Sequence, residues 1–216
     1  AMHIPSRMGI YCSRYAHTHD VYGQMPPSDE PLFMAQQFSQ HGYQTTLSNH
    51  LNMPVTPELA GFQMRTSTPP TTQGTAQEFF SHADSSGKSF FVHFSFGLVH
   101  RPFGQEFDAE RVPTLPVPEV LPDTIITRWD LATLVSQVEQ LDTAVGWILS
   151  ALDEAGLNDQ TIVIFTTDHG VALARHKHTL YDRGLRTALL LRSPSQIPAG
   201  LRSDVLLSNT SLFPTL

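Results

Sequence analysis

The titratable residues with the clearest chemical potential follow an apolar segment at 161–166. Asp168 and His169 follow that segment after Thr167, and Lys177 follows at the end of a loop short enough to fold back over them. A buried strand has no need of so many ionisable groups at its carboxyl end, whereas a site for a metal and an anion does. Asp168 would supply a hard oxygen ligand, and His169 an imidazole ligand or a donor beside the ion. The alternative is a solvated turn that contains Asp-His-Gly by chance, because two candidate ligands are weak evidence alone.

A second polar pair, His100 and Arg101, follows another apolar segment, SFFVHFSF at 89–96. Taken singly, Lys177 is explained as a surface lysine and His100 as a histidine bonded to the backbone. In open α/β sheets, however, binding sites gather outside the carboxyl ends of the strands, and all of these clusters follow predicted strands. A cation with a lysine and a histidine beside it would hold a tetrahedral oxyanion, such as sulfate or phosphate, and stabilise charge on it.

Hydrophobic spacing predicts the elements that position these residues. Apolar residues recur every three or four positions through 130–154, which predicts a long amphipathic helix that ends at Gly156. The other predicted elements are a helix at 28–41, a strand at 43–47, a loop at 51–75, a weak helix at 75–82, a strand at 89–96, a Pro-rich connector at 104–125, and strands at 161–166 and 187–191.

The order of these elements predicts an α/β fold, with a mainly parallel sheet covered by helices on both faces. Nearly continuous apolar runs are typical of strands buried on both sides. We therefore expect segments 89–96, 161–166 and 187–191 to lie in one sheet, with the 130–154 helix packed on its face. The chain has 216 residues, 40% of them hydrophobic, which suffices for one domain with a substantial core.

Composition limits the function further. The net charge of −7 gives no general attraction to nucleic acid or to an anionic membrane, so an anionic substrate would need a local positive site. No apolar run is long enough to span a membrane, and the single cysteine, Cys12, excludes an intrachain disulfide. Residues 1–7 begin as if inside a loop and show no export signal, so we expect one domain over 1–216 that is incomplete at both ends. Compartment and oligomeric state stay open.

Five segments, in matching order, resemble the sulfatase family of the alkaline phosphatase-like superfamily. They are PSRMGIYCSRYAHTH, GYQTTLSNHLN, FFVHFSFGLVHRPF, LPDTIITRWDLATLVSQVEQLDTAVGWILSALDEAGLNDQT, and TIVIFTTDHG with the following HKHTLYDRGLRTALLLRSP. The resemblance covers most of the chain and is closest to the heparan N-sulfatase type. It implies an alkaline phosphatase-like α/β core and metal-assisted hydrolysis of sulfate esters or sulfamates, on a sulfated sugar or a related small molecule.

The resemblance also implies a calcium site. Asp168 would be a Ca²⁺ ligand, and His169 stands where the family has Asn or His, at or beside the ion. The family completes this site with a pair of aspartates that would precede Ala1. One carboxylate alone is too little, because Ca²⁺ takes roughly six to eight oxygen ligands.

Further roles carry over to the residues that would meet the sulfate. Lys177 and His100 would contact its oxygens. Arg7 would support the nucleophile and the metal site, and His50 matches the histidine that hydrogen-bonds the nucleophile.

The nucleophile position departs from the family. The family has a Cys, converted to formylglycine, or a Ser, where this chain has His3, and the Pro5-Ser6-Arg7 register places Cys12 elsewhere. An imidazole at position 3 can bind a metal but cannot be that oxygen nucleophile. Three functions stay open: a sulfatase-family hydrolase, a degenerate non-catalytic relative that binds an anion, and a phosphodiesterase or phosphonate hydrolase of the same superfamily.

Overall fold

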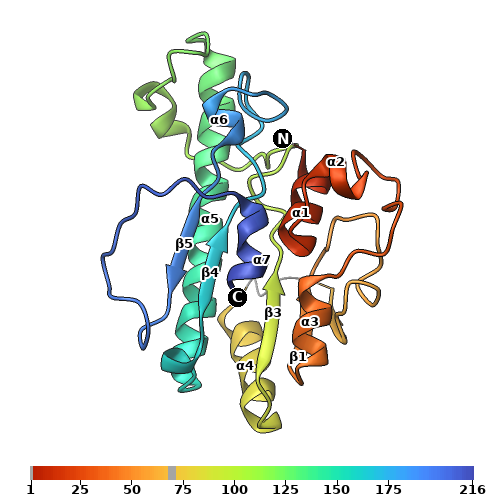
Figure 1. Cartoon of the computed structure of the whole chain (residues 1–216). Helices are drawn as coiled ribbons and strands as arrows, with labels where there is room; N and C mark the ends of the chain where they lie inside the picture. The colour runs from red at the N-terminus through yellow and green to blue at the C-terminus, as the bar shows by residue number, and fades with distance from the viewer. Residues whose placement is uncertain (1, 68–71) are drawn as a thin grey trace.

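The computed structural model describes residues 2–67 and 72–216 and shows an α/β arrangement (Figure 1). The strands are β1 Gln44–Ser48, β2 Met64–Thr66, β3 Phe90–Phe94, β4 Val163–Thr166 and β5 Leu189–Arg192. The α-helices are α1 His3–Cys12, α2 Ala16–His19, α3 Met34–Gln40, α4 Gln73–Ser86, α5 Ile125–Glu154, α6 Asp182–Leu185 and α7 Leu212–Thr215. Short 3₁₀ helices occur at η1 Ala109–Thr114, η2 Asn158–Gln160 and η3 Asn209–Ser211.

The strands form a parallel sheet and a separate antiparallel pair. β1 lies between β2 and β3 and pairs in parallel with both, whereas β4 pairs antiparallel with β5. The prediction of a mainly parallel sheet is confirmed, but the prediction that segments 89–96, 161–166 and 187–191 share one sheet was wrong. The chain returns from β4 to β5 through a loop that holds only the short helix α6, and a crossover to a parallel neighbour usually needs a longer helix. The connection from β3 to β4 runs through α5, which packs against both strands although no backbone ladder joins the two sheets in the described part of the chain.

Helices cover β3 on both faces, as predicted. Phe90 and Phe94 point toward α4 and α5, where their rings meet Phe79 and Phe80. On the opposite face, Phe91 stacks on Phe38 of α3, with ring centroids 4.6 Å apart. This alternation is the period of two that a pleated strand imposes on its side chains. It anchors the end of β3 between two apolar clusters.

The long helix predicted at 130–154 is confirmed and extends to Ile125. The Thr124 side chain accepts a hydrogen bond from the Thr127 backbone N–H, which caps the first turn. Gly156 follows the helix with a φ of 69°, the left-handed conformation that lets the chain turn toward β4. Within the described residues, no helix is both long enough and apolar enough to cross a membrane.

Several local predictions differ from the structure. α1 occupies residues expected to lie in a loop, because Ile4, Met8 and other apolar side chains on it are buried in the first core cluster. The helix predicted at 28–41 begins only at Met34. β2 lies inside the predicted 51–75 loop, whose residues 68–71 fall outside the described part. These short elements form through tertiary contacts rather than through their own periodicity.

Candidate functional site

The side chain of Arg7, on α1, connects the carboxyl ends of strands from both sheets. Its Nε donates to Asp168 Oδ2 after β4, at 3.0 Å. Its Nη1 donates to Ser95 Oγ after β3 and to the Leu51 carbonyl after β1, each at 3.2 Å. One guanidinium therefore fixes the relative positions of segments that are far apart in the sequence.

The Arg7–Asp168 ion pair is largely shielded from solvent. The two side chains are 17% and 19% exposed, and Ser6 Oγ donates to the Asp168 backbone carbonyl. Burial alone would raise the pKa of the Asp168 carboxyl, but the Arg7 guanidinium and His169 outweigh it, so the pKa is lowered. Asp168 is therefore ionised at neutral pH, and Arg7 compensates its charge.

The loop after β4 brings Lys177 back toward the Arg7–Asp168 pair, where its side chain contacts His100. The Lys177 Nζ lies 3.3 Å from His100 Nε2, and His100 Nδ1 lies 2.6 Å from the Arg101 carbonyl. Because a carbonyl only accepts, Nδ1 must carry a proton, which leaves Nε2 of the neutral ring free to accept from the ammonium. Burial lowers the pKa of Lys177, the Asp168 charge opposes that shift, and Arg7 adds to it.

His3 lies beside this pair. Its ring meets that of His100 edge to face, with centroids 6.0 Å apart, and its Nδ1 is buried without a hydrogen-bond partner. Burial lowers the pKa of His3, and the nearby Lys177 ammonium lowers it further, so the imidazole is neutral at pH 7. The structure thus brings His3, His100 and Lys177 together, next to Arg7 and Asp168.

The metal-binding potential of the site rests on Asp168 and His169. His169 Nε2 is buried, has no hydrogen-bond partner, and lies 3.6 Å from Asp168 Oδ1. Its Nδ1 lies 2.8 Å from the Gly170 carbonyl, so in the neutral ring Nε2 carries a lone pair. Burial lowers the pKa of His169, although Asp168 opposes that shift. One carboxylate oxygen and one imidazole nitrogen are available to an ion.

This donor set does not fit calcium as it stands. Ca²⁺ takes roughly six to eight oxygen ligands, whereas the other oxygen of Asp168 is engaged by Arg7. Among residues 2–67 and 72–216, no group of at least three His, Cys, Asp or Glu side chains converges on a possible metal position.

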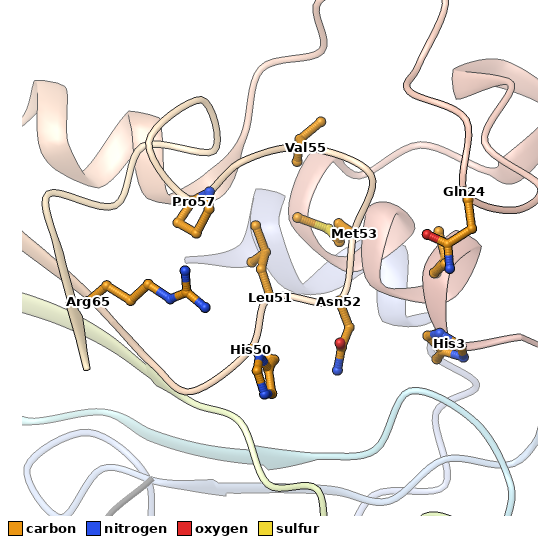
Figure 2. Close-up of a pocket in the computed structure, with 10 residues that line it drawn as sticks. His3, Gln24, His50, Leu51, Asn52, Met53, Val55, Pro57 and Arg65 are labelled. Carbon is orange, nitrogen blue, oxygen red and sulfur yellow. The ribbon is translucent and has the colours of Figure 1, made fainter. Parts of the chain in front are cut away.

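His50 faces a pocket next to the ion pair. The pocket has a volume of about 280 Å³ and lies over the loop that follows β1. Figure 2 shows His50 and His3 on its lower side and the guanidinium of Arg65 extending into it from the left. No hydrogen bond or ring contact joins the side chains of His50 and His3 in the described residues. The His50 carbonyl accepts from Arg7 Nη1 at 3.5 Å, so the structure places the His50 side chain at the edge of the cluster.

Two residues of the site, Ser95 and Arg65, were not singled out from the sequence, whereas Arg101 was named there beside His100. Ser95 is buried and accepts from Arg7, and its position at the end of the 89–96 segment was the available signal. Arg101 pairs with Asp130 of α5 and donates from Nε to the Ala172 carbonyl at 2.7 Å, which ties the loop after β3 to the loop after β4. The sequence did not indicate Arg65 as a site residue, because the strand β2 that carries it was not predicted.

Cys12 lies away from this cluster. The thiol is 6% exposed, packs in the first core cluster and donates to the Met8 carbonyl at 2.9 Å. Burial raises its pKa. A buried thiol of this kind is inert, so Cys12 does not take the place of a nucleophile at position 3.

Gly170 holds the loop after β4 in place. A Cβ at this position would lie 1.9 Å from the Arg183 carbonyl oxygen, a backbone atom that cannot yield easily. We expect Gly170→Ala to lower the free energy of unfolding by about 1–3 kcal/mol, as overpacking does. The matched control is Gly146→Ala in α5, where an added Cβ meets nothing within 4 Å and should stabilise the helix by about 0.5–1 kcal/mol. Urea denaturation measures the free energy of unfolding of both variants and of the unmodified chain. If Gly170→Ala were as stable as the unmodified chain, the close contact would be contradicted.

The arrangement can bind a tetrahedral oxyanion. Lys177 supplies an ammonium, His100 and His3 supply imidazoles, and Asp168 is the acidic side chain that lies among them. Since Asp168 is compensated by Arg7, the remaining charge of this cluster is positive. Positive groups held in fixed positions stabilise anionic oxygens more than flexible ones in water do.

Comparison with known proteins gives a consistent result. The sequence model of the sulfatase family matches residues 3–216. The ulvan-active sulfatase of Formosa agariphila is 35% identical over 100 residues, which cover 46% of this chain and 17% of that protein. The N-sulphoglucosamine sulphohydrolase of Homo sapiens is 36% identical over 101 residues, which cover 46% of this chain and 20% of that protein. The matched segments therefore cover no more than 20% of the length of either relative.

Solved structures share the fold. The phosphonate monoester hydrolase of Silicibacter pomeroyi matches with a TM-score of 0.79 at 17% identity, over 100% of this chain and 63% of that one. At this identity, the likeness concerns the fold and not the reaction.

Proposed function

The chain belongs to the sulfatase family, and from that premise we propose that the cluster at the strand ends binds the sulfo group of a sulfate ester or sulfamate on a sugar. The observation that carries the proposal is the contact between Lys177 and His100 beside the Arg7–Asp168 pair. Two relatives, an ulvan-active sulfatase and an N-sulphoglucosamine sulphohydrolase, bear names that point to sulfated sugars and sulfamates. The proposed reaction is hydrolysis of the bond that joins sulfur to the ester oxygen of the sugar or to the sulfamate nitrogen.

The roles proposed for individual residues follow from where their side chains lie. Lys177 would donate to sulfate oxygens, and His100, whose Nε2 accepts from Lys177, would contact the sulfo group and hold the ammonium in place. His3 would lie closest to the position from which a nucleophile attacks. Arg7 would position Asp168 and the strand ends rather than meet the substrate, because Asp168, Ser95 and the Leu51 carbonyl already accept its hydrogen bonds.

Calcium binding stays a prediction from the family resemblance. Asp168 would contribute one oxygen ligand, with His169 at or beside the ion, and the described residues supply no further carboxylates there. Nothing in the proposed binding of the sulfo group depends on an ion.

Sulfate binding gives the most direct test. We expect inorganic sulfate to bind the chain, and Lys177→Met to weaken that binding by about 10- to 100-fold, because a hydrogen bond to a charged group contributes about 1.5–3 kcal/mol. Isothermal titration calorimetry measures it. The matched control is Lys88→Met: Lys88 is exposed, precedes β3 and so lies at the strand end opposite Ser95. The proposal would be contradicted if sulfate affinity fell equally in both variants, or if it did not fall in Lys177→Met.

A phosphonate monoester is the second candidate substrate class. A phosphonate hydrolase shares the fold over the whole of this chain, and a phosphonate is also a tetrahedral oxyanion. Titration with methylphosphonate beside sulfate separates the two: tighter binding of sulfate favours the first proposal, and tighter binding of methylphosphonate favours the second.

A further inference from the structure

The pocket beside the proposed sulfo site is suited to a sugar ring. Its polar lining consists of His3, Gln24, His50, Asn52 and Arg65. Leu51, Met53, Val55 and Pro57 add apolar surface. Polar groups that meet hydroxyls, beside apolar surface for the C–H face, are what a monosaccharide requires. The volume of about 280 Å³ lies just below the range of about 300–1,000 Å³ that is usual for small-molecule sites, which suits a single sugar ring.

The pocket also adjoins the place where the sulfo group would lie. His3 lines it and is in edge-to-face contact with His100, which in turn meets Lys177. A group attached to a sulfo group held by Lys177 would therefore extend past His3 into this pocket. The side of the pocket away from His3 carries Arg65 (Figure 2).

Arg65 is directed into the pocket by its place in the sheet. It lies on β2 in register with Leu47 of β1, and residues in register on neighbouring strands project from the same face. Leu47 is fully buried in the first core cluster, so Arg65 leaves the sheet on that same face, at the edge. Figure 2 shows its guanidinium directed toward Leu51 and His50.

The charge of Arg65 is not compensated within the described structure. No hydrogen bond or ion pair of its guanidinium is found among residues 2–67 and 72–216, and no acidic residue lines the pocket. The pKa of Glu58 is lowered first by its own backbone and by Thr56, and Arg65 contributes least. An unpaired guanidinium at the far side of a pocket favours a second anionic group on the ligand, because its planar fork matches carboxylate and sulfate oxygens.

We propose that this pocket binds the sugar that carries the sulfo group, and that Arg65 pairs with a second negative charge on that sugar. This inference rests on the proposed function and makes it narrower: the ligand is a doubly anionic sugar, with either a carboxylate or a second sulfate as the second group. Arg65 would then decide specificity, and the Lys177 side of the site would hold the first sulfo group.

Four probes test the inference by calorimetry: inorganic sulfate, N-acetylglucosamine 6-sulfate, N-sulfoglucosamine 6-sulfate and 2-O-sulfoglucuronic acid. We expect at least one doubly anionic sugar to bind about tenfold or more tightly than the singly sulfated sugar, as an added charged hydrogen bond implies. A gain with only the disulfated sugar identifies a second sulfate as the partner of Arg65, and a gain with only the uronate identifies a carboxylate.

Variants show whether Arg65 causes the preference. Arg65→Gln should abolish it and weaken binding of the doubly anionic sugar far more than binding of the singly sulfated sugar or of inorganic sulfate, whereas Arg65→Lys should keep part of the preference. The matched control is Arg202→Gln, because Arg202 is exposed in the loop between β5 and η3 and does not line the pocket. A preference that persists in Arg65→Gln, or none in the unmodified chain, overturns the inference. If inorganic sulfate itself does not bind, the proposed function fails, and the inference fails with it.

Discussion

The unmodified chain is expected to hydrolyse an aryl sulfate at a rate on the order of 10⁶-fold below that of a family enzyme with its nucleophile, because removal of the catalytic side chains in a well-studied hydrolase costs about that much. His3 stands where the family resemblance predicts the nucleophile, and its lowered pKa makes it neutral at pH 7. An imidazole there is not the hydrated aldehyde or hydroxyl from which oxygen attacks sulfur. Cys12 cannot compensate, since its thiol is buried in the core.

The assay compares the chain with a His3→Cys variant co-expressed with the formylglycine-generating enzyme, with and without calcium. His17→Cys is the matched control, because His17 lies exposed on α2, outside the cluster. A gain of turnover in His3→Cys, absent from His17→Cys, would show that position 3 limits the reaction. Calcium-dependent turnover by the unmodified chain at about 1–10³ s⁻¹, the usual range for enzymes, would refute the prediction.

Loss of the Arg7 guanidinium should destabilise the fold far more than loss of an arginine that is paired at the surface. In Arg7→Met, the Asp168 carboxylate stays buried without its partner, which costs about 3–5 kcal/mol for a fully buried pair. Because the two side chains are 17% and 19% exposed, we expect the lower end of that range. Arg14→Met is the matched control: Arg14 pairs with Asp29 at the surface, with 36% and 48% exposure, and its loss should cost less than about 1 kcal/mol.

The cost of Arg7→Met should depend on pH. The pKa of Asp168 is lowered in the folded chain, so the ion pair stabilises the fold above the ordinary pKa of the carboxyl and this contribution is lost as pH falls through the lowered value. Without Arg7, burial raises the pKa of Asp168 instead, and protonation relieves the unpaired charge. The difference in unfolding free energy between the two proteins should therefore narrow from pH 7 toward pH 4. A difference that does not change with pH would show that Arg7 stabilises through packing alone.

Much of the candidate site could be predicted from the sequence. Asp168 and His169 closely follow one apolar run and His100 follows another, and the ends of such runs are where an open α/β sheet exposes binding sites. The helix α5 was predictable because its apolar spacing of three and four repeats over many turns. The family resemblance added His3, Arg7 and the departure at the nucleophile position.

Other features depend on contacts between distant segments. Two sheets form instead of one, α1 forms in an expected loop, and β2 brings Arg65 to the pocket. Periodicity reports which face of an element is apolar, but it does not report which neighbour that face meets. The pairing of Arg7 with Asp168 across the strand ends is of the same kind, because both residue types are common at protein surfaces. The packing of α1 against the strand ends shields this pair from water, and it thereby places the two charges at the centre of the candidate site.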